Sequence, residues 1–354
     1  MQRSNDGLFY TQQGKPFTLS WRLGNQQAFR LEPVTDLPGT LKVPAPADRL
    51  YTPMSLPAVL IVVSERGGGA SHFFNWLLNA EAGSHRSTAG TAEAGKSRST
   101  KSAAAAGWQR LSLGAAYKEL SSWIRKPSRL RIVIDRTVGE EPDDELRRAL
   151  AEIVSIIELP EWKESSSRLI CATREVRKLK IDPLYSNLLS RGQACRLPHF
   201  SSPELAHWCA ELAQKWKLNG TMELDDLAKE VKRWVGGQPT LTQFFFRFVA
   251  DQLENEPKSD APELFRQAGK YLRDHRPHIV DRWALDLRDL LELPPVRHRL
   301  EIYASGGTKD PMDPDFDDED ASLFLAGWVG LNPDKQWGIR SLCHLQWARE
   351  ILRS

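Results

Sequence analysis

The sequence contains few cysteines. The four are Cys171, Cys195, Cys209 and Cys343. None forms a C-x-x-C pair, which excludes a fold built on a disulfide framework and suits a reducing compartment. Cys195 with His199, and His207 with Cys209, have spacings that fit no usual zinc ligand pattern. We therefore expect no zinc site.

Long apolar runs are also missing. The longest, around Leu56 to Val63 and Phe244 to Ala250, are far shorter than the roughly 18 residues that a membrane span needs. The N-terminal stretch MQRSNDGLFYTQQ lacks the apolar core of a secretion signal. These two absences predict a cytoplasmic protein without a membrane partner.

Neither sign of charge is in excess. Lysine and arginine number 48 against 46 acidic residues, so the net charge is +2 and gives no overall signature of nucleic-acid binding. A hydrophobic content of 41% with 27% charged residues is ordinary for a soluble globular protein. At about 100–200 residues per domain, the 354 residues predict two or three domains.

The residue pattern divides the chain into four parts. Residues 1–48 show apolar and aromatic residues near period two and indicate a small β-rich segment. Residues 49–200 alternate apolar strands with helices, which indicates an α/β domain with a mostly parallel sheet. Within it, residues about 81–107 are mostly small and polar, so we expect a flexible surface insertion. Residues 201–258 predict a helical domain, and residues 259–354 predict a winged helix.

The expected elements can be placed individually. The predicted strands of the α/β domain are Ala58–Val63, Gln109–Leu113, Arg129–Asp135, Arg168–Thr173 and Ala194–Leu197. The predicted helices are Ser71–Asn79, Ala115–Ile124, Asp143–Ile157, Pro203–Lys217, Glu223–Val235 and Thr240–Leu253. Near the end of the chain, two short strands flank an Asn332-Pro333-Asp334 turn and a helix follows, as in the wing of a winged helix.

The stretch VLIVVSERGGGASHFF, from Val59 to Phe74, has the order of a phosphate-binding loop. An apolar strand enters a glycine-rich turn, and an amphipathic run follows it. Gly67, Gly68 and Gly69 can adopt the positive φ that a phosphate nest needs. The alternative is a glycine turn between a strand and a helix, with no ligand.

Aligned on G-x-x-x-x-G-K-[ST], this stretch departs from the motif at its central residue. Ser64 stands for the first glycine, Gly69 for the second, Ala70 for the lysine and Ser71 for the hydroxyl that binds Mg²⁺. The missing lysine removes a charge-assisted contact worth about 1.5–3 kcal/mol in binding. We therefore expect residual nucleotide binding without efficient hydrolysis.

Two other cations are candidates to replace that lysine. Arg66 lies within the loop, and Lys96 belongs to a full motif match, GTAEAGKS from Gly90 to Ser97. No apolar strand precedes Gly90, so the match lacks the context that makes the motif work. If Arg66 or Lys96 does contact the phosphates, the protein is an active ATPase instead.

A second signature lies in RLRIVIDRTVGEEP. Asp135 ends an apolar strand, which is the place of a Mg²⁺-holding Walker B aspartate. The next residue, often an acid that positions the attacking water in related ATPases, is Arg136. Two departures, Ala70 and Arg136, thus fall where hydrolysis would take place.

Two further segments follow the glycine-rich stretch and the Asp135 strand along the chain. The strand RLICATREV ends at Thr173-Arg174, and GGQP opens a helix at Pro239. In this order the sequence resembles the STAND branch of the AAA+ P-loop NTPases, from roughly Leu50 to the C-terminus. The resemblance implies a five-stranded parallel P-loop NTPase sheet, a helical lid and a winged helix. It also implies that Ser71 and Asp135 hold Mg²⁺ and that Arg174 is the sensor arginine.

The resemblance assigns two more residues and a function. Pro239, with the two residues before it, looks like the lid contact to the nucleotide base, and His344 looks like a winged-helix histidine that approaches the β-phosphate. STAND proteins act as nucleotide-dependent switches that assemble and trigger an effector. The losses at Ala70 and Arg136 imply a regulatory or scaffold module, a pseudo-ATPase that binds ATP or ADP with Mg²⁺ weakly. Such modules act with separate partner proteins or as homo-oligomers, and they occur in prokaryotic defence and signalling systems.

A winged-helix DNA-binding module is the third reading. The closing helix offers Arg340, Arg349 and Arg353. Acidic residues are interspersed upstream, and the loop from Asp310 to Asp320 would repel phosphates, so we expect no nucleic-acid partner. The same loop begins like a calcium site, but Pro314 interrupts the spacing, and we expect no calcium either.

Overall fold

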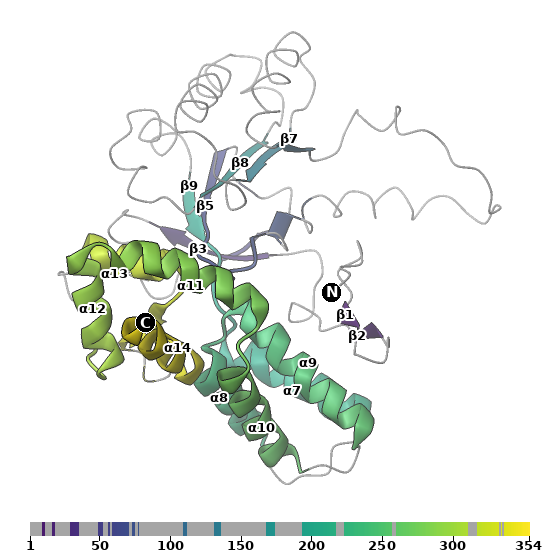
Figure 1. The fold of residues 1–354 in the computed structure, drawn as a ribbon. Coiled ribbons are helices and arrows are strands. Elements are labelled where there is room, and N and C mark those ends of the chain that lie inside the picture. The colour runs from purple at the N-terminus through teal and green to yellow at the C-terminus, as the bar shows by residue number, and fades with distance from the viewer. Residues whose placement is uncertain are drawn as a thin grey trace, which may run out of the picture. The chain divides into compact units, whose positions relative to one another are not determined.

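The computed structural model describes part of the chain. The longer described ranges are 59–70, 193–216, 223–256, 260–310, 317–332 and 336–354, and several strands and single residues lie outside them. The chain divides into two compact units. The helical unit comprises Met1–Asn25, Glu65–Gly68 and Pro198–Ser354, and the sheet unit comprises Gln26–Ser64 and Gly69–Leu197. Figure 1 labels most of their elements.

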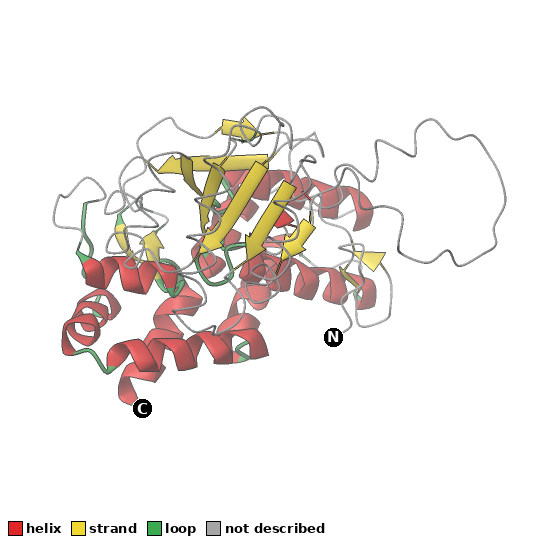
Figure 2. Cartoon of the chain, turned by 90° about the horizontal axis from the view of Figure 1, so that it is seen from above, coloured by secondary structure: helices red, strands yellow, loops and turns green. Residues whose placement is uncertain are grey.

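The sheet unit is built on seven strands in the order β4-β3-β9-β5-β8-β7-β6. They are β3 (Phe29–Val34), β4 (Arg49–Tyr51), β5 (Val59–Val63), β6 (Gln109–Leu111), β7 (Arg131–Asp135), β8 (Arg168–Thr173) and β9 (Gln193–Arg196). The five strands from β9 to β6 in this order run parallel to one another, and strands lie side by side in Figure 2. Every residue of β5 is buried, as expected for a strand that has a neighbour on each side.

One strand of the predicted N-terminal segment, β3, belongs to this sheet. β3 pairs antiparallel with β9, so that Pro33 lies opposite Cys195, and with β4, which begins just after that segment. Period-two alternation predicted a strand at β3, but it carries no information about a partner more than a hundred residues away. The earlier hairpin, β1 (Phe9–Tyr10) with β2 (Pro16–Phe17), forms a separate two-stranded sheet.

The helical unit contains most of the described helices. Its elements are α7 (Ser202–Trp216), α8 (Leu224–Val235), α9 (Pro239–Asn255), α10 (Ala261–Asp274), α11 (His278–Leu291), α12 (Pro294–Ala304), α13 (Asp318–Leu325), β10 (Val329–Leu331), β11 (Trp337–Ile339) and α14 (Leu342–Arg353). The first three confirm the predicted helices at 203–217, 223–235 and 240–253. β10, β11 and α14 lie where the wing was expected, and the name winged helix stays a prediction.

Helix ends in this unit follow from local chemistry. α8 ends at Gly236, whose φ of 68° is left-handed and whose N–H donates to the carbonyl of Lys232. Gly237 is also left-handed, with a φ of 70°, and a Cβ there would lie 2.6 Å from the carbonyl oxygen of Phe200. Pro239 then occupies the first turn of α9, where its missing N–H costs nothing. This glycine pair fixes the angle at which α9 leaves α8.

An aromatic cluster forms part of the helical unit's core. Trp208 lies 5.4 Å from Phe246 between ring centroids, and Phe245 lies 5.6 Å from Phe265, both edge to face. These four side chains are at most 1% exposed. Edge-to-face packing of buried rings stabilises the contacts of α7 with α9 and of α9 with α10.

Several predictions fall outside the described residues. They are the helices at 115–124 and 143–157, the insertion at about 81–107, and Asp313 in the acidic loop. Among the described helices, none combines the length and the apolar content that crossing a membrane requires.

Candidate functional site

The stretch after β5 adopts the backbone conformation of a tight glycine turn. Gly67 and Gly69 have φ values of 72° and 90°, which side-chain-bearing residues rarely adopt. The Gly68 N–H donates to the carbonyl of Glu65 over 3.1 Å, and the Phe73 N–H donates to the carbonyl of Gly69 over 3.0 Å. The second bond is the first turn of a helix, which includes Ala70. Ala70 is buried, and Ser71 lies outside the described residues.

Asp135 lies at the carboxyl edge of the parallel strands. It is the last residue of β7 and pairs in register with Ala172 of β8, which pairs in turn with Val62 of β5. The carboxyl ends of neighbouring parallel strands are where an open α/β sheet binds its ligands. The backbone therefore places Asp135 on the sheet edge from which the glycine-rich stretch departs. Arg136 and Arg174 lie outside the described residues.

The helical unit includes the short segment Glu65–Gly68, called the loop segment below. A buried ion pair holds its first residue, Glu65. Glu65 is 4% exposed and Arg340, between β11 and α14, is 0% exposed. Arg340 Nη1 donates to Glu65 Oε1 over 2.6 Å, and Nη2 donates to Oε2. This bidentate arrangement is the strongest common form of a carboxylate–guanidinium contact.

Other groups fix the guanidinium of Arg340. Its Nε donates to the carbonyl of Val329 over 2.5 Å, and Nη2 donates to the carbonyl of Phe324 over 3.3 Å. The Phe324 ring centroid lies 5.0 Å from Cζ. Gly330 makes room for it, since a Cβ there would lie 2.9 Å from Nε. Arg340 was one of the three arginines that the alternative DNA-binding reading offered, and its side chain is buried inside the unit.

His199 completes this cluster. Its Nε2 contacts Glu65 Oε1 and lies 2.5 Å from Arg340 Nη1. Burial by itself would raise the pKa of Glu65, but the charges of Arg340 and His199 outweigh it and lower that pKa to about 2. Glu65 is consequently ionised at neutral pH even though it is buried.

Arg66, the candidate substitute for the missing lysine, is engaged inside the helical unit. Its guanidinium forms an ion pair with Asp286 of α11, and its backbone N–H donates to the carbonyl of Leu325 over 3.0 Å. An acid therefore already neutralises the charge of Arg66. Lys96, the other candidate cation, lies outside the described residues.

The segment that opens α9 contacts the backbone of Arg66 and Gly67. Gln238 Nε2 donates to the carbonyl of Arg66 over 2.7 Å. The N–H and the hydroxyl of Thr240 each lie 3.2 Å from the carbonyl oxygen of Gly67. Trp283 of α11 fills the space beside Gly67, where a Cβ would lie 2.7 Å from the indole. The predicted contact residue Pro239 thus lies between two residues that bind the loop backbone.

His344 lies one turn into α14 and is 1% exposed. Its Nδ1 lies 2.7 Å from Ser341 Oγ, and its Nε2 has no hydrogen-bond partner among the described residues. Burial and the charge of Arg340 lower its pKa to about 3, so the imidazole is neutral at pH 7. A neutral imidazole with one unpartnered nitrogen is suited to a single hydrogen bond with a polar ligand.

The residues weighed as zinc ligands have other roles. His207 Nε2 lies 3.2 Å from Glu211 on the next turn of α7, and Cys195 and Cys209 are buried. Burial raises the pKa of Cys209 to about 12, so it stays a thiol. In the part of the chain that the structure describes, no group of His, Cys, Asp or Glu has the geometry to hold a metal ion.

Sequence reasoning missed the residues that hold the loop segment. They are Glu65, His199, Thr240, Trp283, Asp286 and Arg340 as a buried residue, whereas Gln238 belongs to the segment that was predicted as the lid contact. The only local signal is Glu65, an acid two residues after the end of a buried strand, and such an acid is usually solvated. Its partners lie 134 and 275 positions away along the chain.

No family model matches the sequence, and no curated protein does. Solved structures with some similarity include a Walker-type ATPase of Pyrococcus abyssi, with 12% identity, 84% of this chain and 91% of the other covered, and a TM-score of 0.39. The ORC2 protein of Aeropyrum pernix, in ADPNP–ADP complexes, has 11% identity, coverage of 84% and 88%, and a TM-score of 0.46. The RuvB Holliday junction branch migration motor of Thermotoga maritima has 13% identity, coverage of 79% of this chain and 84% of the other, and a TM-score of 0.40. At TM-scores of at most 0.46, these likenesses carry no argument about family or activity.

Proposed function

We propose that this chain is a regulatory or scaffold module of the STAND type, with a degenerate P-loop that binds ATP or ADP weakly and hydrolyses it slowly or not at all. The observation that carries the proposal is the glycine-rich stretch after β5. It keeps positive φ values at Gly67 and Gly69, and it has Ala70 where the motif has lysine. The positive φ values support a loop that could accept a phosphate, and Ala70 lacks the charge that would neutralise the phosphate during hydrolysis.

The surroundings of the loop segment support a regulatory rather than a catalytic role. Arg66 is paired with Asp286, so the nearest cation in the sequence is already neutralised. In this proposal, Asp135, the last residue of β7, binds Mg²⁺ together with Ser71. In this proposal, β10, β11 and α14 are a winged helix, and the module acts with partner proteins in prokaryotic defence or signalling.

Calorimetry with ATP and with ADP, each with and without Mg²⁺, tests this function alongside a phosphate-release assay. We expect weak binding and no turnover above the buffer rate. Robust hydrolysis by the unaltered chain would instead support the active ATPase, with Arg66 or Lys96 as its cation. In that case alanine at the responsible position should abolish turnover.

Restoring the lysine gives a sharper test. Ala70→Lys should tighten ATP binding by about tenfold or more, because a charge-assisted phosphate contact contributes about 1.5–3 kcal/mol. Ala70 is buried, so Ala70→Met serves as the matched control that adds a long side chain without a charge. Equal ATP affinities of the two variants would show that this position does not face a phosphate.

A further inference from the structure

The side chain of Arg340 has no access to water. Among the described residues, its guanidinium forms a bidentate contact with one anion, the carboxylate of Glu65. The planar fork of a guanidinium matches a carboxylate and a phosphate equally well. The backbone carbonyls of Val329 and Phe324 hold the fork in place. The orientation of Arg340 thus has support besides Glu65, and the fork stays preorganised for whichever anion is present.

Glu65 itself comes from the stretch in which an anion is expected. It directly follows Ser64, the first position of the phosphate-loop alignment, and the left-handed Gly67 is two residues further on. His199, which contacts the same carboxylate oxygen, adds a second nitrogen group to the cluster. His344 has a buried nitrogen without a partner among the described residues, and its titration is influenced by Arg340, Glu65 and His199, so it belongs to the same charged neighbourhood.

We propose that Glu65 is an internal anion that occupies a phosphate-binding site formed by Arg340 and His199, and that it must be displaced before a polyphosphate can bind there. The proposal rests on the proposed function only for the class of ligand. It explains how the helical unit keeps a buried arginine compensated without nucleotide. It also makes weak nucleotide binding a consequence of competition and not only of the lost lysine.

Removing the charge of Glu65 while keeping its shape tests the proposal directly. The probe is inorganic pyrophosphate, titrated calorimetrically into the full chain at pH 7.5 and constant ionic strength. Glu65→Gln should bind pyrophosphate at least tenfold more tightly than the unaltered chain, because the buried guanidinium then lacks a counter-charge. The double variant Glu65→Gln with Arg340→Met should lose that gain.

A matched control separates this effect from a general change of charge. Glu204→Gln removes one negative charge from the same unit, where Glu204 accepts hydrogen bonds from the N–H and hydroxyl of Ser201 and not from Arg340. It should bind pyrophosphate as the unaltered chain does. Equal pyrophosphate affinity of Glu65→Gln and the unaltered chain would overturn the proposal, and so would a gain that persists in the double variant or appears equally in the control.

Folding of the variants is checked by circular dichroism. If Glu65→Gln does not fold, Glu65→Asp decides the question, because it keeps the charge and withdraws the carboxylate by one methylene. A tighter pyrophosphate complex of Glu65→Asp supports the internal anion, and an unchanged one overturns it. Absence of ATP binding to the unaltered chain would contradict the proposed function alone, since pyrophosphate carries neither base nor ribose.

Discussion

At the scale of the residue, Glu65 and His344 are buried groups of the helical unit whose protonation makes the folded state less stable in acid. The pKa of Glu65 is lowered to about 2, so its contribution to stability is present above its ordinary value of 4.5 and is lost as the pH falls through about 2. His344 is buried neutral with a pKa of about 3, against 6.5 when exposed. The unfolded chain therefore binds a proton at His344 that the folded chain does not, between about pH 6.5 and 3.

His344→Gln should flatten the acid limb of the stability curve. Between pH 6.5 and 3, the free energy of unfolding of the unaltered chain should fall as the pH falls, and His344 accounts for a slope of up to about 1.4 kcal/mol per pH unit. The variant lacks that titration and should lose this part of the slope. Urea denaturation at a series of pH values measures it. His298→Gln, at an exposed position of α12, is the control. A variant with the slope of the unaltered chain would show that His344 is protonated in the folded state.

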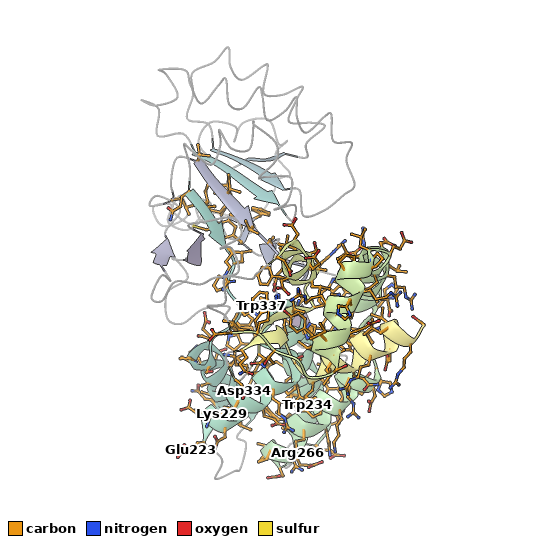
Figure 3. All side chains as sticks on the ribbon, turned by 90° about the vertical axis from the view of Figure 1, so that its left-hand side faces the viewer. Glu223, Lys229, Trp234, Arg266, Asp334 and Trp337 are labelled. Carbon is orange, nitrogen blue, oxygen red and sulfur yellow. The ribbon has the colours of Figure 1, made fainter. Side chains whose placement is uncertain are left out.

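At the scale of the element, α8 and α10 approach each other through a glycine. A Cβ at Gly269 would lie 2.1 Å from Cδ2 of Trp234, which Figure 3 labels on α8. The indole cannot easily give way, because its Nε1 donates to Glu230 over 2.7 Å and Arg273 lies 6.0 Å above its ring. Glycine has a low helix propensity, but Gly269 is required in α10 because no larger residue fits against Trp234.

Gly269→Ala should therefore destabilise the protein in spite of its better helix propensity. Alanine gains up to about 1 kcal/mol in a helix interior, whereas forcing a methyl group into a filled contact costs about 1–3 kcal/mol. The expected net loss is about 1–2 kcal/mol. Chemical denaturation measures it against Gly338→Ala, where the added Cβ would meet its nearest atom at an ordinary 3.4 Å. A stabilised Gly269→Ala would mean that the two helices separate readily.

At the scale of the whole molecule, the balance of basic and acidic residues bears on whether the protein can bind DNA. The 48 basic and 46 acidic residues nearly cancel. Arg340 is buried, so it cannot contribute to a basic surface. Arg299 and Lys309 are paired with Asp317 and Asp320. This balance gives no overall electrostatic signature of DNA binding.

Duplex DNA should accordingly bind weakly. Fluorescence anisotropy of a labelled duplex, followed from about 50 to 200 mM salt, should show no steep dependence of the binding constant on salt, because each phosphate contact adds about 0.9 to the logarithmic slope. A slope of several units would indicate several phosphate contacts and revive the DNA-binding reading. Arg349→Ala and Arg353→Ala would then test whether α14 supplies them.

Local patterns in the sequence determined the elements and one half of the candidate site. Apolar runs located β5, β7 and β8, and capping residues and periodicity located α7, α8 and α9, because these signals act within a few residues along the chain. The positive φ of Gly67 and Gly69 follows equally from residue type. The absent lysine is a fact of the sequence alone.

Only the tertiary structure decided which groups meet around Glu65. Arg340 is 275 positions away and stands in a sequence context typical of a solvated cation. The pairing of β3 with β9 and the fit of Trp234 against Gly269 are equally non-local. Such contacts are selected by packing and by the need to compensate buried charge, and neither leaves a local periodic signal. The sequence alone could therefore indicate a phosphate-loop pattern, but it could not indicate that the carboxylate of Glu65 pairs with Arg340.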